Sequence, residues 1–470
     1  MTRFPALAAA AALLLAGCAS VPHVDPQVAQ LKPATLGLGA ATPAVQSDWW
    51  RAFGDPQLDR LVDTALAGSP DLAVALARVR AAQAQIEGDR SALLPHVGAT
   101  VVVNRAHIAE RLLPPPVGGS TANLGIATGS LSWDLDLFGR QHATLRAAMQ
   151  AAEATQLDAE AARLAISTSM AQTYVGLARA ERLIAVADGF VATRQQALGL
   201  VESRIRNELA SEFDRKQAET LLAEAQQART RAVAQRDTLV HALAALAGRG
   251  ADYYAQIAPP TLALDQPPGV PETLPADLLG RRPDLLAGQA RIDAAVQGRK
   301  AAAAAFLPDV NISALAGLTA IGLDNFFKGS AVSWMGGPAL SLPIFEGGKL
   351  RAQYRGATAD LDLAVAGYNL SVLGAVREAS DAITGVRAAD QDIADQARVV
   401  QGLRDTVRLD QVRVSTGLGS RLDTVESGFR LLEAEQALVD LQAAALTKRI
   451  QLIAALGGGY SSPASDLRHD

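Results

Sequence analysis

The sequence has few cysteine, histidine and aromatic residues. Its 470 residues include one cysteine, so neither an intrachain disulfide nor a cysteine-based zinc site can form. The six histidines are scattered without metal-site spacing, and no glycine-rich phosphate loop is present. Aromatic residues make up only 4%, and a net charge of −5 argues against a general affinity for nucleic acid. We therefore expect no enzyme activity, no cofactor and no metal.

Long charge-free hydrophobic runs are absent beyond the N-terminus. Residues 6–16 are apolar, but a helix needs about 20 such residues to span a bilayer. The longest later stretch without charge, residues 112–133, is rich in proline, glycine, serine and threonine. No later segment is therefore expected to be a transmembrane helix, and a mature chain that crosses a membrane must do so as strands.

The single cysteine lies directly after the apolar N-terminal run. A basic start, the apolar residues and the small pair Ala16-Gly17 predict a signal peptide over residues 1–17. The stretch Leu15-Ala16-Gly17-Cys18 resembles a bacterial lipobox, which implies that Cys18 becomes the mature N-terminus and carries lipid. Ala19 in the second place implies export to the outer membrane. The alternative is an ordinary signal peptide with a chance cysteine.

An internal repeat runs through the rest of the chain. The sequence SPDL at residues 69–72 recurs as RPDL at 282–285, and LPHV at 94–97 recurs as LPDV at 307–310. Residues 204–214 match residues 413–423 in the same order and at nearly the same spacing. This pattern predicts two structural repeats of about 200 residues, joined by a proline-rich seam.

Each repeat is predicted to contain a helix, two strands, a long helix and a last helix. Leu-Pro ends the first helix in both repeats, because proline cannot continue a helix. The expected helices cover residues 57–92, 140–205, 211–247, 282–305, 349–414 and 420–456, and the expected strands cover residues 97–105, 125–137, 310–318 and 334–344.

The predicted strands alternate apolar and polar residues. In residues 130–137, Leu131 and Trp133 alternate with Ser132 and Asp134. This period is ordinary for a half-buried sheet and is also typical of transmembrane barrels. Four strands cannot close a membrane barrel, and an open sheet in lipid would leave unpaired edges. Two copies would give a filled barrel of eight strands, whereas three copies give twelve strands and a channel.

The predicted helices carry coiled-coil spacing. Apolar positions alternate by three and four residues along the last helix, as at Leu446, Ile450 and Ile453, and along the long helix before it. A long helix of about 66 residues would extend roughly 100 Å. We therefore expect a mainly α fold in which long coiled-coil helices form an α-barrel, together with four strands per chain that contribute to a trimeric 12-stranded membrane β-barrel.

Two motifs resemble those of the outer membrane factor family, the TolC-like channels. Residues 274–285, LPADLLGRRPDL, resemble a stretch of the NodT/OprM-like lipoprotein branch that serves RND-type efflux systems, and residues 345–348, FEGG, resemble the same branch. The resemblance implies an outer-membrane homotrimer with a periplasmic extension and an equatorial collar. It further implies a passive exit duct for drugs or other small amphiphilic compounds, joined through a periplasmic adaptor to an inner-membrane RND-type transporter.

The repeat and the resemblance together divide the chain. Residues 18–55 form the lipidated N-terminal segment and part of the collar, and residues 56–250 form repeat 1. A linker or equatorial segment covers residues 251–280, repeat 2 covers residues 281–457, and the tail covers residues 458–470.

The resemblance also implies the functional residues. The hairpin ends, with Asn207, Glu208 and Leu209 in repeat 1 and Gly417 and Leu418 in repeat 2, match the periplasmic tips that contact the adaptor. Glu208 departs from the pattern, because a glycine stands at that position in repeat 2.

The acidic pair Asp423 and Glu426 matches the gate positions of TolC-like channels. Their i, i+3 spacing puts both carboxylates on one helical face, and three copies would form an acidic ring that selects cations. The competing interpretation is a solvated helix start, where acidic residues are favoured by the helix dipole.

Two other functions fit parts of the pattern. One is a TolC-like conduit for secreted proteins or peptides, which shares the fold but not the efflux-branch motif. The other is a lipid-anchored periplasmic coiled-coil protein, which explains the heptads but not the strands.

Overall fold

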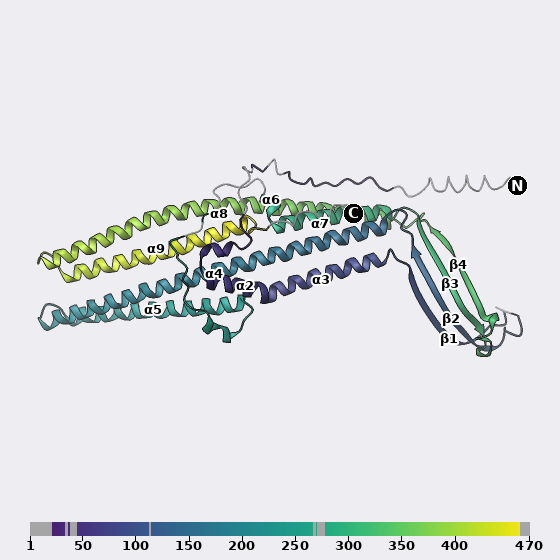
Figure 1. Cartoon of the computed structure of the whole chain (residues 1–470), viewed down its shortest axis with the longest axis horizontal. Coiled ribbons are helices and arrows are strands. Elements are labelled where there is room, and N and C mark those ends of the chain that lie inside the picture. The colour runs from purple at the N-terminus through teal and green to yellow at the C-terminus, as the bar shows by residue number, and fades with distance from the viewer. Residues whose placement is uncertain are drawn as a thin grey trace. The chain divides into compact units, whose positions relative to one another are not determined.

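A computed structural model describes residues 21–32, 36–37, 45–111, 114–266, 269 and 278–460. It is mainly helical, with one antiparallel sheet (Figure 1). Cys18, the predicted signal peptide and residues 461–470 lie outside the described residues. The chain divides into two compact units. The first comprises the residues up to Gln30, Arg78–Thr155 and Gly288–Tyr368, and the second comprises Leu31–Ala77, Gln156–Ala287 and the residues from Asn369 onward.

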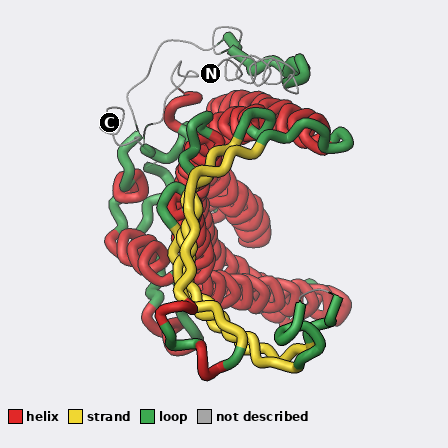
Figure 2. The backbone as a smooth tube through the Cα atoms, turned by 90° about the vertical axis from the view of Figure 1, so that its right-hand side faces the viewer, coloured by secondary structure: helices red, strands yellow, loops and turns green. Residues whose placement is uncertain are grey.

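The first unit contains the sheet. Its strands are β1 (His96–His107), β2 (Thr121–Asp134), β3 (Asp309–Ile321) and β4 (Val332–Ser341), and they pair antiparallel in that order. The sheet is curved and open (Figure 2). Within the described residues, β1 and β4 therefore each pair along one side only.

The strand register gives the sheet one apolar face. Residues that pair directly share a face, and one row across the four strands is Ala99, Gly129, Ala316 and Trp334. The neighbouring rows on this face are also apolar and include Val97, Val101, Leu131, Val310, Leu318 and Leu340. The opposite face carries Thr100, Thr128, Ser130, Ser132, Ser313 and Ser333. The apolar face is open, since Val97 is 79% exposed and Trp334 80%.

Two strands end earlier than the sequence predicted. β2 stops at Asp134 rather than residue 137, because Asp136 has φ 45° and leaves the extended conformation. Its carboxylate accepts the backbone N–H groups of Gln141 and His142 at 2.8 Å each, at the start of the next helix. β4 stops at Ser341 rather than residue 344, since Pro343 has no N–H to donate to a ladder.

The helices come in pairs of equal length, one from each half of the chain. The first ones are α3 (Pro70–Ser91) and α7 (Pro283–Ala304), with 22 residues each. The long helices α4 (Arg140–Arg206) and α8 (Lys349–Ser415) have 67 residues each. The last helices, α5 (Glu212–Leu246) and α9 (Arg421–Ala455), have 35 residues each.

A proline divides the first expected helix, whereas the fourth expected helix, over residues 282–305, is continuous as predicted. The helix expected over residues 57–92 is instead α2 (Pro56–Gly68) and α3, with Ser69 extended between them at φ −65° and ψ 126°. The α conformation is unfavourable for a residue that precedes a proline, as Ser69 does. Pro70 itself has no N–H to donate within a helix. The helix expected from residue 282 starts at Pro283, after the short α6 (Leu278–Arg281).

The main core lies in the second unit. Trp49 and Trp50, in a short 3-10 helix (Trp49–Phe53), pack with α2, α4, α5 and α9. Along α9, the expected heptad positions Ala443, Leu446, Ile450 and Ile453 belong to this core, whereas Leu452 packs in a second cluster with α8. The helix α9 thus buries two faces.

Among the described residues, α8 alone is long and apolar enough to cross a membrane by length and composition. The sequence itself predicts no transmembrane helix after the N-terminus. One such helix is weak support for a membrane span, because core helices of soluble proteins can have the same length and composition.

Candidate functional site: the ends of the helical hairpins

The two hairpin turns, between α4 and α5 and between α8 and α9, have the same backbone geometry. In the first turn, Leu209 N–H donates to the carbonyl of Arg204 at 2.9 Å, and Glu208 N–H donates to Ile205 at 2.9 Å. In the second, Leu418 N–H donates to Arg413 at 2.8 Å, and Gly417 N–H donates to Val414 at 3.1 Å. This is the Schellman pattern that ends many helices.

Glu208 adopts the conformation that the pattern requires of its position. Its φ is 59°, against 76° for Gly417 in the second turn. Left-handed backbone costs a non-glycine residue roughly 1–2 kcal/mol. The sequence departure at Glu208 therefore changes the local strain but not the hydrogen bonding of the turn.

Each turn presents exposed apolar side chains. Leu209 is 67% exposed and Leu418 is 75% exposed, at matched positions of the two turns. Four residues later, Phe213 and Leu422 are also exposed. The sequence analysis did not single out this second pair, although the repeat aligns the two positions. Asn207 donates its side-chain N–H to the carbonyl of Ser203 at 2.7 Å and serves the turn itself.

Asp423 forms part of the N-terminal cap of α9. Its Oδ2 accepts the backbone N–H of Ser420 at 3.2 Å, in a capping box with that residue. Asp214 makes the same capping box with Ser211 at the start of α5. The hydrogen bonds from Ser211 lower the pKa of Asp214. Asp423 and Asp214 therefore share a structural role as helix caps, which is independent of the proposed gate.

Glu426 lies one turn further along α9. It accepts a hydrogen bond from Arg430 at 2.9 Å, and both side chains are largely exposed. Glu426 also borders a groove of about 490 Å³ between α4, α5 and α9, which Asp423 does not line. The predicted gate pair thus shares a helix face, but only one member meets this groove.

Two of the residues that line this groove form a cation–aromatic contact. The Arg194 guanidinium of α4 lies 3.5 Å from the centre of the Phe429 ring of α9, which also stacks on Phe190 at 6.2 Å. Burial lowers the pKa of Arg194. Sequence reasoning missed this contact, because its members are far apart in the chain and no short motif joins them.

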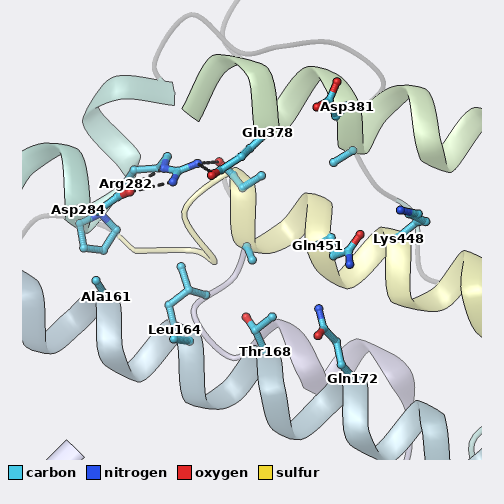
Figure 3. Close-up of a pocket in the computed structure, with 15 residues that line it drawn as sticks. Ala161, Leu164, Thr168, Gln172, Arg282, Asp284, Glu378, Asp381, Lys448 and Gln451 are labelled. Carbon is cyan, nitrogen blue, oxygen red and sulfur yellow. Dashed lines mark hydrogen bonds and ion pairs between the residues drawn. The ribbon is translucent and has the colours of Figure 1, made fainter. Parts of the chain in front are cut away.

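A second recess, of about 500 Å³, lies between α4, α7, α8 and α9 (Figure 3). At its edge Arg282 donates to Asp284 at 2.8 and 3.1 Å, to Glu378 at 3.0 Å and to the carbonyl of Ala455 at 3.2 Å. Burial alone would lower the pKa of Arg282, but the hydrogen bonds and charges of Asp284 and Glu378 raise it. Arg282, the second arginine of the RRPDL motif, thus bonds to α7, α8 and α9.

The described residues contain no group of three or more histidine, cysteine or acidic side chains placed to hold a metal ion. The chemistry available at the hairpin ends is therefore that of exposed apolar contacts, carboxylates and helix caps.

Comparison with known proteins gives consistent matches over nearly the whole chain. A family profile described as outer membrane efflux protein matches residues 61–249 and 274–458. The fusaric acid resistance protein FusA of Burkholderia cepacia is 36% identical over 362 residues, covering 74% of this chain and 68% of that protein. The multidrug resistance outer membrane protein MdtP of Shigella flexneri is 31% identical over 465 residues, covering 96% and 95%. The solved structure of the outer membrane protein VceC of Vibrio cholerae matches with a TM-score of 0.81 at 31% identity, covering 88% of this chain and all of that one.

Proposed function

The chain belongs to the outer membrane efflux protein family, and we propose that three copies of it form the exit duct of a tripartite efflux pump. The family resemblance predicted from sequence is confirmed, as are the outer-membrane location and the role as an efflux channel. Members of this family are channels rather than enzymes. The duct is passive, so its energy comes from the inner-membrane transporter to which a periplasmic adaptor joins it.

The observation that carries the trimer is the open sheet. Its apolar face covers all four strands, and its two outer edges pair with nothing else in the described residues. Unpaired N–H and C=O groups are very costly in lipid, so β1 of one copy must pair with β4 of another. Three copies give twelve strands with apolar side chains outward and the serine- and threonine-rich face lining the channel.

The proposal retains the division of the chain into two repeats, with limits at residues 56–250 and 281–457. Residues 18–55 and 251–280 contribute to the collar, and residues 458–470 form the tail. Cys18 is the acylated N-terminus after removal of residues 1–17. The hairpin turns with Leu209 and Leu418 contact the adaptor. The relatives' names mention fusaric acid and multiple drugs, which supports small amphiphilic compounds as cargo.

Deletion of the gene tests the duct directly. We expect the deletion strain to become sensitive to several amphiphilic drugs while its secreted proteins stay unchanged, because a duct for an RND-type pump carries small compounds. The purified protein should migrate as a heat-modifiable trimer and should pull down an adaptor. Loss of a secreted protein with unchanged drug sensitivity would favour the secretion conduit instead. A protein that never forms a trimer would favour a lipid-anchored coiled coil.

The acidic pair Asp423 and Glu426 gives a second prediction. We propose that three copies of the pair surround the periplasmic opening and select cations. Asp423→Asn with Glu426→Gln removes the charges while leaving an oxygen at position 423 to cap α9. Conductance in planar bilayers should lose its cation preference and its block by multivalent cations. Asp214→Asn, at the equivalent cap of α5, should leave both properties intact. Selectivity that survives in the double variant would place the constriction elsewhere.

A further inference from the structure

The first described residues of the chain have no helix or strand, yet they are held at fixed points. Asp362 of α8 accepts the backbone N–H groups of Gln27 at 2.8 Å and Val28 at 3.0 Å on the same oxygen. Arg299 of α7 donates to the carbonyl of Val24 at 2.8 Å. Two charged side chains, one from α7 and one from α8, thus bond three backbone groups of this segment, at residues 24, 27 and 28. Charge-assisted hydrogen bonds are stronger than neutral ones.

The groups that grip the segment are themselves held in place. Arg299 also donates to Thr358 Oγ1 at 3.2 Å and lies 5.2 Å from the centre of the Tyr354 ring. Thr358 is only 2% exposed and donates to the carbonyl of Tyr354. Val28 packs on an apolar cluster of α7 and α8 formed by Ile292, Leu361 and Val365. The segment is therefore fixed through its backbone and through Val28, although most of its other side chains are exposed.

The contacts also give the direction of the segment. Val24 is bonded to Arg299 of α7, which itself contacts Thr358 of α8, whereas Val28 is bonded to Asp362, one turn further along α8. Its partners on α7 run the opposite way, from Arg299 at Val24 to Gln289, which accepts from the side chain of Gln30 at 2.6 Å. Followed back toward the N-terminus, the segment heads for the end of α7 and the start of α8, where β3 and β4 join these helices.

We propose that α7 and α8 form a docking track for residues 24–30, which aims the lipid anchor at Cys18 toward the sheet of its own copy. From Thr358 to the start of α8 at Lys349 the helix rises about 14 Å. The chain from Cys18 to Val24 extends at most about 20 Å. The sulfur can therefore reach the membrane end of the helices, but little further. The aiming role rests on the proposed acylation of Cys18, whereas the docking does not.

Hydrogen exchange of the full-length trimer in detergent tests the docking. Asp362→Ala should speed exchange of the Gln27 and Val28 amides at least tenfold, because both donors lose their acceptor. Asp362→Asn keeps an oxygen but loses the charge, and should give an intermediate rate. Asp360→Ala changes an exposed carboxylate on the same helix and should match the wild type. Equal exchange in Asp362→Ala and wild type, with the trimer intact, would overturn the track.

Crosslinking tests the aim of the anchor. With Cys18 acylated, Val21→Cys and Arg351→Cys are the only free thiols, and a bismaleimide of about 10 Å should link them within one copy. Adding Asp362→Ala should lower the yield at least fivefold. A thiol at Asp293→Cys, further from the sheet end of α7, should give little product in place of Arg351→Cys. Equal yields at the two positions would contradict the direction of the track.

Intact mass separates the two claims. A mature chain that begins at acylated Cys18 supports the anchor, and Cys18→Ser should leave the amide protection of residues 27 and 28 unchanged. A Cys18 without lipid would overturn the aiming role, while protected amides would still support the docking.

Discussion

Aspartate at both exposed turn leucines, Leu209→Asp with Leu418→Asp, is expected to make cells as drug-sensitive as a deletion strain while trimer levels stay normal. Both side chains are mostly exposed at the ends of capped hairpins, so changing them should cost the fold within about 0.5 kcal/mol. The same change places a charge in the middle of the apolar contact that we propose with the adaptor. The few residues that dominate an interface contribute about 2 kcal/mol or more to binding, and a buried charge in such a contact would be more costly still.

The repeat makes the two turns equivalent, which gives the test an internal comparison. Each single variant should weaken resistance, and the double variant should abolish it, because the proposed trimer would present three copies of both turns. Drug sensitivity and adaptor pull-down should fall together. Leu418→Met keeps an apolar side chain of similar size and should retain near-normal resistance. Full resistance in the double variant, at wild-type trimer levels, would show that the adaptor does not need these leucines.

The sequence predicted the helix limits well where local signals mark the ends. Ser211 and Ser420 begin the last helices through capping boxes, and Gly417 ends α8 in a left-handed turn. Such signals involve neighbouring residues only, so they are readable without a structure. Pro70 carried an equally local signal, and the continuous helix drawn through it was an error of interpretation.

The strand ends were harder to predict, because long-range pairing and side-chain caps decide them. Apolar alternation in the sequence continues to Leu137, but Asp136 turns its carboxylate to the start of α4 and ends the strand. Alternation describes which residues fit a sheet face, whereas the length of a strand depends on its partners.

In the candidate site, too, residues with local signals could be predicted and long-range contacts could not. Turn residues were found from the repeat and from the family pattern. The capping role of Asp423 also had a local signal, its spacing from Ser420, although the sequence analysis named only a solvated helix start beside the gate. Two other contacts join residues that are far apart in the chain. Arg194 contacts Phe429, and Asp362 accepts hydrogen bonds from the N-terminal segment. A single sequence contains no pattern that pairs them.

Asp55 is expected to be the most sensitive polar position of the main core. Its carboxylate is 1% exposed, and it accepts from Gln57 N–H at 2.9 Å, from Thr261 N–H at 2.9 Å and from the Tyr174 hydroxyl at 2.7 Å. These bonds fasten the start of α2 and the segment between the two halves to the long helix α4. Gln57 reinforces them by pairing with both backbone groups of Ala258.

Asp55→Ala should loosen the segment between the halves by about 3 kcal/mol, because three donors lose a charged acceptor and two of them are backbone groups. Chymotrypsin should then cleave at Tyr253 and Tyr254 on the order of 100-fold faster, provided that cleavage follows local opening. The control variant Asp63→Ala changes an exposed residue within α2 and should be cleaved at the wild-type rate. Unchanged cleavage in Asp55→Ala would mean that packing alone holds the segment.

The Asp55 carboxylate also determines how the stability of this segment changes with pH. Burial by itself would raise the pKa of Asp55, but hydrogen bonds from Tyr174, Gln57 and Thr261 outweigh it and lower the pKa below its ordinary value. Since the unfolded value is about 3.9, the stabilisation is complete above that pH and is lost as the pH falls through the lower folded value. Wild-type cleavage should therefore stay slow from neutral pH down to about 4 and accelerate below it, measured with an acid-active protease. Asp55→Asn has no proton to take up at this position, so its cleavage should be faster at neutral pH and should lack that acid step.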